Sequence, residues 1–194
     1  MNSWHLKRAV HSLRGGALIA YPTESVFGLG CDPYNRDAVD RVLAVKRRPA
    51  GRGLILLGSE ISQFAPFLAG VDRATRDMME ATWPGPVTWV VPCTASVPAW
   101  LRASDDTVAL RVTAHPLAAS LCQLFGDAVV STSANLRGRP PARSALQVRL
   151  RLKATRLGYI LPGATGGSRR PSEIRDARTR AVLRAGGAMA AVKE

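Results

Sequence analysis

Two pairs of residues in this chain have the chemistry needed to hold a negatively charged ligand. Lys46 and Arg48 are two positions apart, and Ser133 and Asn135 have the same spacing after an apolar run. Lys offers a compact point charge and Arg a planar fork of donors, so neither replaces the other. Ser and Asn add hydroxyl and amide hydrogen bonds. Structural roles are the alternatives: cations at a helix end stabilise the dipole by ~0.3–1 kcal/mol, and Ser or Asn can cap a turn.

A third polar segment, Pro-Thr-Glu-Ser at positions 22–25, follows a short apolar run that we expect to form a buried strand. Proteins of the α/β class commonly place ligand groups in loops at strand tips. The Thr23 hydroxyl can donate and accept hydrogen bonds, which suits a bound amino acid; the alternative is that it closes an ordinary turn. Glu24 has no clear role from sequence, and Gly28 and Gly30 do not form a G-x-G-x-x-G phosphate loop.

A single charge, Arg111, interrupts an apolar strand predicted over 107–112. An edge strand or a solvated face would accommodate it. His115 stands before Pro116 at a predicted helix start, where it can act as a local cap. We assign His115 no catalytic role.

Helix and strand signals alternate along the chain that must position these groups. The first predicted helix has an apolar stripe of Trp4, Ala9, Val10 and Leu13 and ends at the glycine pair 15–16. The other predicted helices start after the cap Asn35 or span 72–82, 116–125 and 144–152. The predicted strands span 17–21, 53–57, 87–91, 107–112, 128–133, 159–161 and 181–184. This order predicts a mixed α/β fold.

Composition sets the class of protein. The 194 residues are 46% hydrophobic and 21% charged, which suits one globular domain over 1–194. Because the chain has no long apolar run and its first residues lack a signal-peptide core, we expect a cytoplasmic protein without a membrane partner. The three cysteines, Cys31, Cys93 and Cys122, are odd in number and widely spaced, so we expect small buried thiols.

The formal net charge is +13, the usual sign of a polyanionic partner. Residues 1–135 carry 13 basic and 11 acidic side chains, whereas residues 136–194 carry 14 basic and 3 acidic ones. Two interpretations stay open: a basic face that meets RNA phosphates, or a compositional preference for Arg over Lys.

Four segments together resemble the YrdC/TsaC family in its short bacterial form: 21–30, 46–48, 131–135 and 171–176. They occur in the family's order, and the match runs from about 17 to 184. The resemblance implies an open, twisted, mixed sheet flanked by helices, with a deep, basic, concave cleft. Departures are Glu173, where the wider family has a second hydroxyl, and Arg137, where many relatives have Ser.

The resemblance also implies the residues of the site. Catalysis would fall to Lys46 and Arg48. ATP would be bound by Lys46, Arg48, Arg111, Ser133, Asn135 and Arg184, and threonine by Thr23, Ser131 and Ser172. No metal bound by the protein itself is expected.

The implied activity is L-threonylcarbamoyladenylate synthesis from ATP, L-threonine and bicarbonate, for modification of a tRNA adenosine next to the anticodon. The amine of threonine and bicarbonate would form a carbamate, whose oxygen attacks the α-phosphorus of ATP and expels pyrophosphate, with Mg²⁺ sharing the phosphate charge. No side-chain nucleophile is needed, because the carbamate itself attacks. Catalysis would come from proximity, which can supply ~7–11 kcal/mol, and from charge stabilisation by Lys46, Arg48 and Arg111. The adenylate would pass to a separate transferase complex, expected to be TsaB, TsaD and TsaE.

One function of a different class stays open from sequence. The chain could be a non-catalytic module that binds double-stranded RNA or tRNA through phosphate and 2′-hydroxyl contacts. A second enzyme alternative is the carbamoyl-adenylate chemistry of hydrogenase-maturation proteins that contain a YrdC-like domain. It is disfavoured because those proteins are much longer and carry cysteine-rich zinc segments, which this sequence lacks.

Overall fold

A nine-stranded mixed sheet forms the centre of the protein in a computed structural model that describes residues 3–49, 51–153, 155–168 and 170–186. The strands are β1 (Leu18–Pro22), β2 (Phe27–Gly30), β3 (Ile55–Gly58), β4 (Val87–Pro92), β5 (Thr107–Val112), β6 (Val129–Ser133), β7 (Leu157–Ile160), β8 (Glu173–Asp176) and β9 (Val182–Arg184). The helices are α1 (Ser3–Arg14), α2 (Arg36–Lys46), α3 (Arg73–Glu80), α4 (Pro116–Phe125) and α5 (Ala145–Arg151), with a 3₁₀ helix η1 (Ile61–Phe67).

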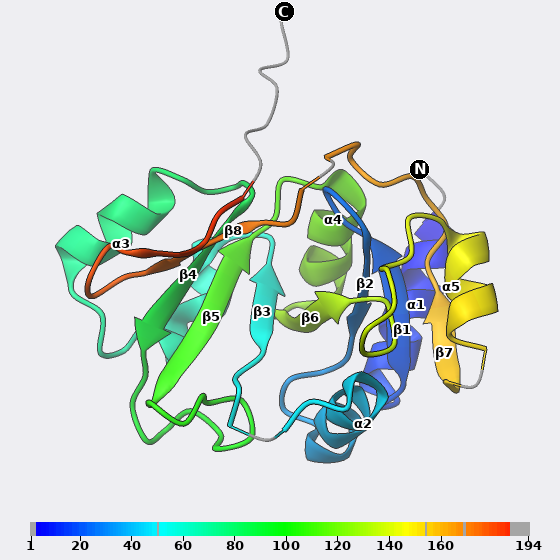
Figure 1. Ribbon diagram of the computed structural model, residues 1–194, viewed down its shortest axis with the longest axis horizontal. Coiled ribbons are helices and arrows are strands. Elements are labelled where there is room, and N and C mark those ends of the chain that lie inside the picture. The colour runs from blue at the N-terminus through cyan, green and yellow to red at the C-terminus, as the bar shows by residue number, and fades with distance from the viewer. Residues whose placement is uncertain (1–2, 50, 154, 169, 187–194) are drawn as a thin grey trace, which may run out of the picture.

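The strand order is β7-β1-β2-β6-β3-β5-β4-β8-β9. Three neighbouring pairs are parallel (β1 with β7, β3 with β5, β4 with β8), and the others are antiparallel. Strand β6 joins the two halves seen in Figure 1, because Ser131 pairs with β3 while Thr132 and Ser133 pair with β2. The polar end of β6 therefore lies at the middle of the sheet.

The two faces of the sheet are covered unequally. On one face, a large apolar core includes Val108, Leu110 and Val112 of β5. On the other face, α1 and α4 pack over the half of the sheet that runs from β7 to β3, with a smaller core that includes Tyr21 and Leu57. The alternate residues of β5, among them Arg111, line a cavity on this second face. Because successive side chains of a strand point to opposite faces of the sheet, alternate residues of β5 face the core and the cavity.

Side-chain caps begin the helices, as their sequences favour. Asn35 accepts a hydrogen bond from the Ala38 amide at the start of α2, which confirms the predicted cap. Asp72 and Ser144 do the same for α3 and α5. His115 caps α4 through Nδ1, which accepts from the Ala118 amide at 3.5 Å, so the predicted local role is confirmed.

Strand β2 was not predicted, because its sequence Phe-Gly-Leu-Gly has low strand propensity. Its glycines are required by the Tyr21 ring of the neighbouring strand. A Cβ on Gly30 would lie 2.3 Å from the Val130 carbonyl oxygen and 2.9 Å from the ring, and one on Gly28 would lie 3.1 Å from the ring. These glycines serve packing within the sheet.

The predicted mixed α/β fold is confirmed, but several details differ. Strand β8 was missed because Glu-Ile-Arg-Asp is mostly charged. Trp4 is 55% exposed, and Leu6 takes its place in the buried stripe of α1. Cys31 and Cys122 are buried free thiols, whereas Cys93 is only partly buried, since it lies at the end of β4 near Asp106. Within the described residues, no helix combines the length and apolar character needed to span a bilayer.

Candidate functional site

A cavity of about 730 Å³ lies over the sheet face that α1 and α4 leave uncovered. Its walls come from the β1–β2 loop, the end of α2, strands β3, β5 and β6, and the segment 170–184. Among the described residues, seven Lys or Arg side chains line the cavity and one carboxylate, Asp105, does so. The lining therefore favours anionic ligands, while the deep, concave shape implied by the resemblance stays a prediction.

Lys46 is held at the cavity wall by the polar end of β6. Its Nζ lies 2.8 Å from the Ser133 carbonyl oxygen, 3.3 Å from Ser133 Oγ, 2.9 Å from the Asn135 carbonyl oxygen and 2.7 Å from Asn135 Oδ1. Burial and, to a smaller extent, the neighbouring Arg48 charge lower the pKa of Lys46 to about 8. Four oxygen acceptors stabilise the ammonium form. Lys46 is thus a cation with a fixed position.

Asn135 is linked to the cavity by the hydrogen bonds that it accepts from Lys46. It does not belong to the residues that line the cavity within the described part of the chain. Its Oδ1 also accepts from Ser133 Oγ at 2.6 Å, and its Nδ2 donates to the carbonyls of Leu136 and Arg139. The amide therefore fastens the turn after β6 and orients Lys46.

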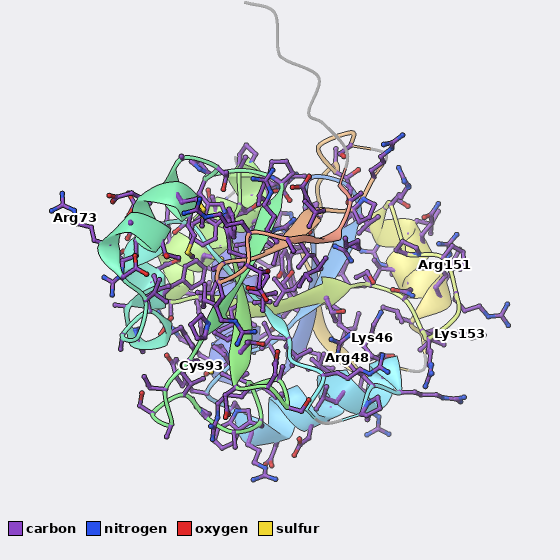
Figure 2. The ribbon with its side chains drawn as sticks, turned by 60° about the vertical axis from the view of Figure 1, so that its left-hand side comes forward. Lys46, Arg48, Arg73, Cys93, Arg151 and Lys153 are labelled. Atoms are coloured by element: carbon purple, nitrogen blue, oxygen red, sulfur yellow. The ribbon has the colours of Figure 1, made fainter. Side chains whose placement is uncertain are left out.

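The end of α2 separates the basic triplet into two cavity residues and one outer residue. Arg47 is the C-cap, with a left-handed φ of 44°, a conformation that non-glycine residues adopt infrequently. Lys46 and Arg48 on either side of it line the cavity, and Figure 2 shows them next to each other above α2. Arg48 Nη2 donates to the carbonyls of Arg52 and Gly53 at 2.5 and 2.8 Å. Burial, aided by Arg52, lowers the Arg48 pKa.

Thr23 and Ser131 face the same cavity from adjacent parts of the sheet. Thr23 Oγ1 donates to the Val26 carbonyl at 2.7 Å, so the turn-closing role is real, and the oxygen can still accept a hydrogen bond from a ligand. Ser131 is 6% exposed and lies beside Tyr21. Both roles considered for Thr23 are therefore compatible.

Ser172 and Arg184 line the same cavity from the end of the sheet formed by β8 and β9. Arg184 donates through Nε and Nη2 to the Ser172 carbonyl at 3.1 and 2.8 Å, and Nη2 also lies 3.2 Å from Ser172 Oγ. Thr88 Oγ1 donates to the same hydroxyl at 3.2 Å. These contacts bring β9 and the residue before β8 to the cavity, although they lie far from Lys46 in the sequence.

Arg111 is on an interior strand, so the edge-strand alternative was wrong. Strand β5 lies between β3 and β4, and Arg111 is 8% exposed. Its Nη2 is 3.4 Å from Glu24 Oε2. Glu24 is thus the acidic partner of a cation that lines the cavity. In the sequence, only its position beside Thr23 distinguished it.

All but one of the predicted site residues line this cavity: Thr23, Lys46, Arg48, Arg111, Ser131, Ser133, Ser172 and Arg184. Asn135 stands directly behind it. Their roles toward individual ligands stay predictions.

Comparisons with known proteins agree with this geometry. The family model Sua5/YciO/YrdC, described as telomere recombination, matches residues 11–186. A relative from Nitrosococcus oceani, named threonylcarbamoyl-AMP synthase, is 53% identical over 182 residues, which are 94% of this chain and 98% of the relative. A relative of the same name from Halorhodospira halophila is 50% identical over 93% of this chain and 94% of its own.

A solved structure has the same fold. The crystal structure of P. abyssi Sua5 complexed with L-threonine superposes with a TM-score of 0.88 and 31% sequence identity, over 96% of this chain. The present chain spans 55% of that Sua5 chain. The match of the family model over most of the sequence, together with these relatives, shows that the chain belongs to the Sua5/YciO/YrdC family.

Proposed function

We propose that this protein is a threonylcarbamoyl-AMP synthase, which forms the adenylate and pyrophosphate from ATP, L-threonine and bicarbonate. One observation carries the proposal: Lys46 is fixed by Ser133 and Asn135 in a cation-lined cavity that also contains Thr23. A fixed cation beside hydroxyl groups is what transfer of a nucleotidyl group requires. The curated relatives at about half identity bear the name of this activity.

The reaction needs positioning and charge stabilisation more than it needs a nucleophilic side chain. The amine of threonine attacks the carbon of bicarbonate; a C–N bond forms, a C–O bond breaks and water leaves, which gives the carbamate. A carbamate oxygen then attacks the α-phosphorus of ATP; a new P–O bond forms and the bond to pyrophosphate breaks. Lys46 and Arg48 stabilise the negative charge that develops at the phosphates, and Arg111 and Arg184 add to the field. Thr23, Ser131 and Ser172 offer hydrogen bonds to threonine, whose position is thereby fixed.

We assign the metal ion, Mg²⁺, to ATP. The described residues contain no group of three or more His, Cys, Asp or Glu side chains able to hold a metal. Asp105, the carboxylate of the cavity lining, already accepts from Thr107 Oγ1 at 2.7 Å and lies 3.7 Å from Arg178 Nη2. These residues do not fit a protein metal centre. A magnesium ion bound to the phosphates shields their charge.

The wider setting follows from the same proposal. The adenylate would be consumed by a transferase complex of TsaB, TsaD and TsaE that modifies tRNA, and the protein would act in the cytoplasm as a single domain over 1–194. The continuous nine-stranded sheet supports the single domain.

The test is pyrophosphate release by the purified protein with ATP and Mg²⁺, with L-threonine and bicarbonate each present or omitted. We expect release only when both co-substrates are present, with threonylcarbamoyl-adenylate detected by mass spectrometry. Release without threonine, or no release from folded protein that binds ATP, would contradict the proposal. In the second case, tRNA binding that falls steeply with salt would support the RNA-binding alternative.

A further inference from the structure

Glu24 is a buried carboxylate in the loop between β1 and β2, directly after Thr23, and it is 8% exposed. Its two oxygens have different surroundings. Oε1 accepts from Thr113 Oγ1 at 2.7 Å and from the Ala114 amide at 3.1 Å. The Thr113 oxygen in turn accepts from the His115 amide at 3.1 Å. Oε1 is therefore satisfied by the segment between β5 and α4.

The second oxygen, Oε2, faces the Arg111 guanidinium. It lies 3.4 Å from Nη2, yet neither Oε2 nor Arg111 Nε makes a hydrogen bond to any described atom, and both are buried. Isolated buried donors and acceptors are rare in folded proteins. The two charges are thus brought together while part of their hydrogen-bonding capacity stays unused.

Glu24 remains ionised despite its burial. Burial acts to raise its pKa, but the Arg111 charge and hydrogen bonds from the backbone, Thr113 and Ala114 together hold the pKa below its ordinary value. A buried ion pair contributes little net stability compared with apolar residues of the same size. Stability alone therefore gives a weak reason for placing this pair beside the cavity, where Arg111 alone of the two lines the wall.

The surroundings of Arg111 indicate what the pair does. Arg111 lines the cavity, and the positive charge of Arg184 acts on the same region. A guanidinium among other cations would be repelled from them and would have several orientations available. A carboxylate fixed by two hydrogen bonds from the opposite side restricts that freedom. It also links Arg111 to the loop that carries Thr23.

We propose that Glu24 is a positioning residue, which holds the Arg111 guanidinium in the orientation that receives the anionic phosphates of ATP. This role rests on the proposed function for the identity of the ligand. Glu24 itself does not line the cavity, so it acts through Arg111 and is not a catalytic residue.

The test is a double-mutant cycle with Glu24→Gln and Arg111→Gln. The amide oxygen that E24Q introduces can still accept from Thr113 and Ala114, so this substitution removes the charge and retains the shape. We expect each single variant to lower kcat/KM for ATP by about tenfold or more, mainly through weaker binding of ATP, because the guanidinium that receives its phosphates is lost or misplaced. We expect the double variant to match R111Q within about twofold, because a residue that acts only through Arg111 has no effect once Arg111 is removed. Glu80→Gln, at an exposed carboxylate on α3, is the matched control.

Two results would overturn the proposal: losses that multiply in the double variant, or E24Q activity within about twofold of the unchanged protein. If E24Q does not fold, the double variant, which has no uncompensated buried charge, is compared with R111Q instead. Equal ATP dissociation constants support the proposal, and weaker binding by the double variant overturns it.

The same cycle measured on the ATP dissociation constant by calorimetry does not depend on turnover. A protein that binds ATP without making the adenylate would therefore refute the proposed function, while the cycle would still decide the role of Glu24.

Discussion

The cations of the cavity and those of the outer helices have the same chemistry but very different surroundings. Lys46 has four oxygen acceptors within 3.3 Å, from two residues of a separate strand end. Arg73 on α3 has a side chain that is 95% exposed, and its Nε lies 3.9 Å from Asp77 Oδ2 in an exposed ion pair. Figure 2 shows Arg73 pointing away from the molecule. In a chain of net charge +13, the contacts that fix a cation therefore distinguish the site better than charge does.

The largest difference should appear between Lys46 and its neighbour Arg47. We expect Lys46→Ala to lower the rate of adenylate formation by at least about a hundredfold, because the fixed positive charge at the phosphates is lost. Arg47→Ala removes a charge from the same helix end, but Arg47 is exposed and does not line the cavity. The activity of the Arg47→Ala variant should stay within about twofold of that of the unchanged protein. Equal losses in the two variants, measured by pyrophosphate release, would mean that the net charge of the helix end matters and the fixed position does not.

Arg48 allows charge and geometry to be separated. Arg48→Ala should lower kcat/KM for ATP by about ten- to a hundredfold, and Arg48→Lys should recover only part of this loss. Lys retains the charge but cannot reproduce the planar fork of Arg, which here donates to the carbonyls of Arg52 and Gly53. Full recovery in the Lys variant, in steady-state kinetics, would show that charge alone suffices at this position.

The affinity for ATP should depend on pH because of Lys46. Its pKa is lowered to about 8, so the ammonium is present below that pH and lost above it. ATP binding should therefore weaken as the pH rises through about 8, in calorimetric titrations between about pH 7 and 9.5. The Lys46→Ala variant should bind weakly without this inflection. An inflection that persists in the variant would assign the titration to another group.

The smallest effect is expected at the surface. Arg73→Ala should change the free energy of unfolding by less than about 0.5 kcal/mol and the activity by less than about twofold, since exposed ion pairs contribute little. Denaturant unfolding and pyrophosphate release measure the two quantities. A large loss of activity would show that distant surface charge contributes to ATP binding, and its suppression by salt would identify a long-range field.

Much of the fold could be predicted from local patterns. Apolar periodicity and caps predicted the strand over 107–112 and the helix over 116–125, which have the same bounds in the structure. The strands β2 and β8 could not be predicted in this way. Gly-Leu-Gly and Glu-Ile-Arg-Asp are stabilised by their neighbours in the sheet, Tyr21 and β4, and not by their own propensity.

The sequence by itself determined the chemical groups of the site: the cations, hydroxyls and amide, with their spacing along the chain and their match to a family. Only the tertiary structure decided which of them meet. Ser133 and Asn135 lie 87 and 89 positions from Lys46, and Glu24 reaches Thr113 across 89 positions. Such contacts depend on strand order and on which face of a strand each residue occupies. For this reason the sequence alone assigned Glu24 no role, and only the structure shows that Arg111 of β5 lies next to it.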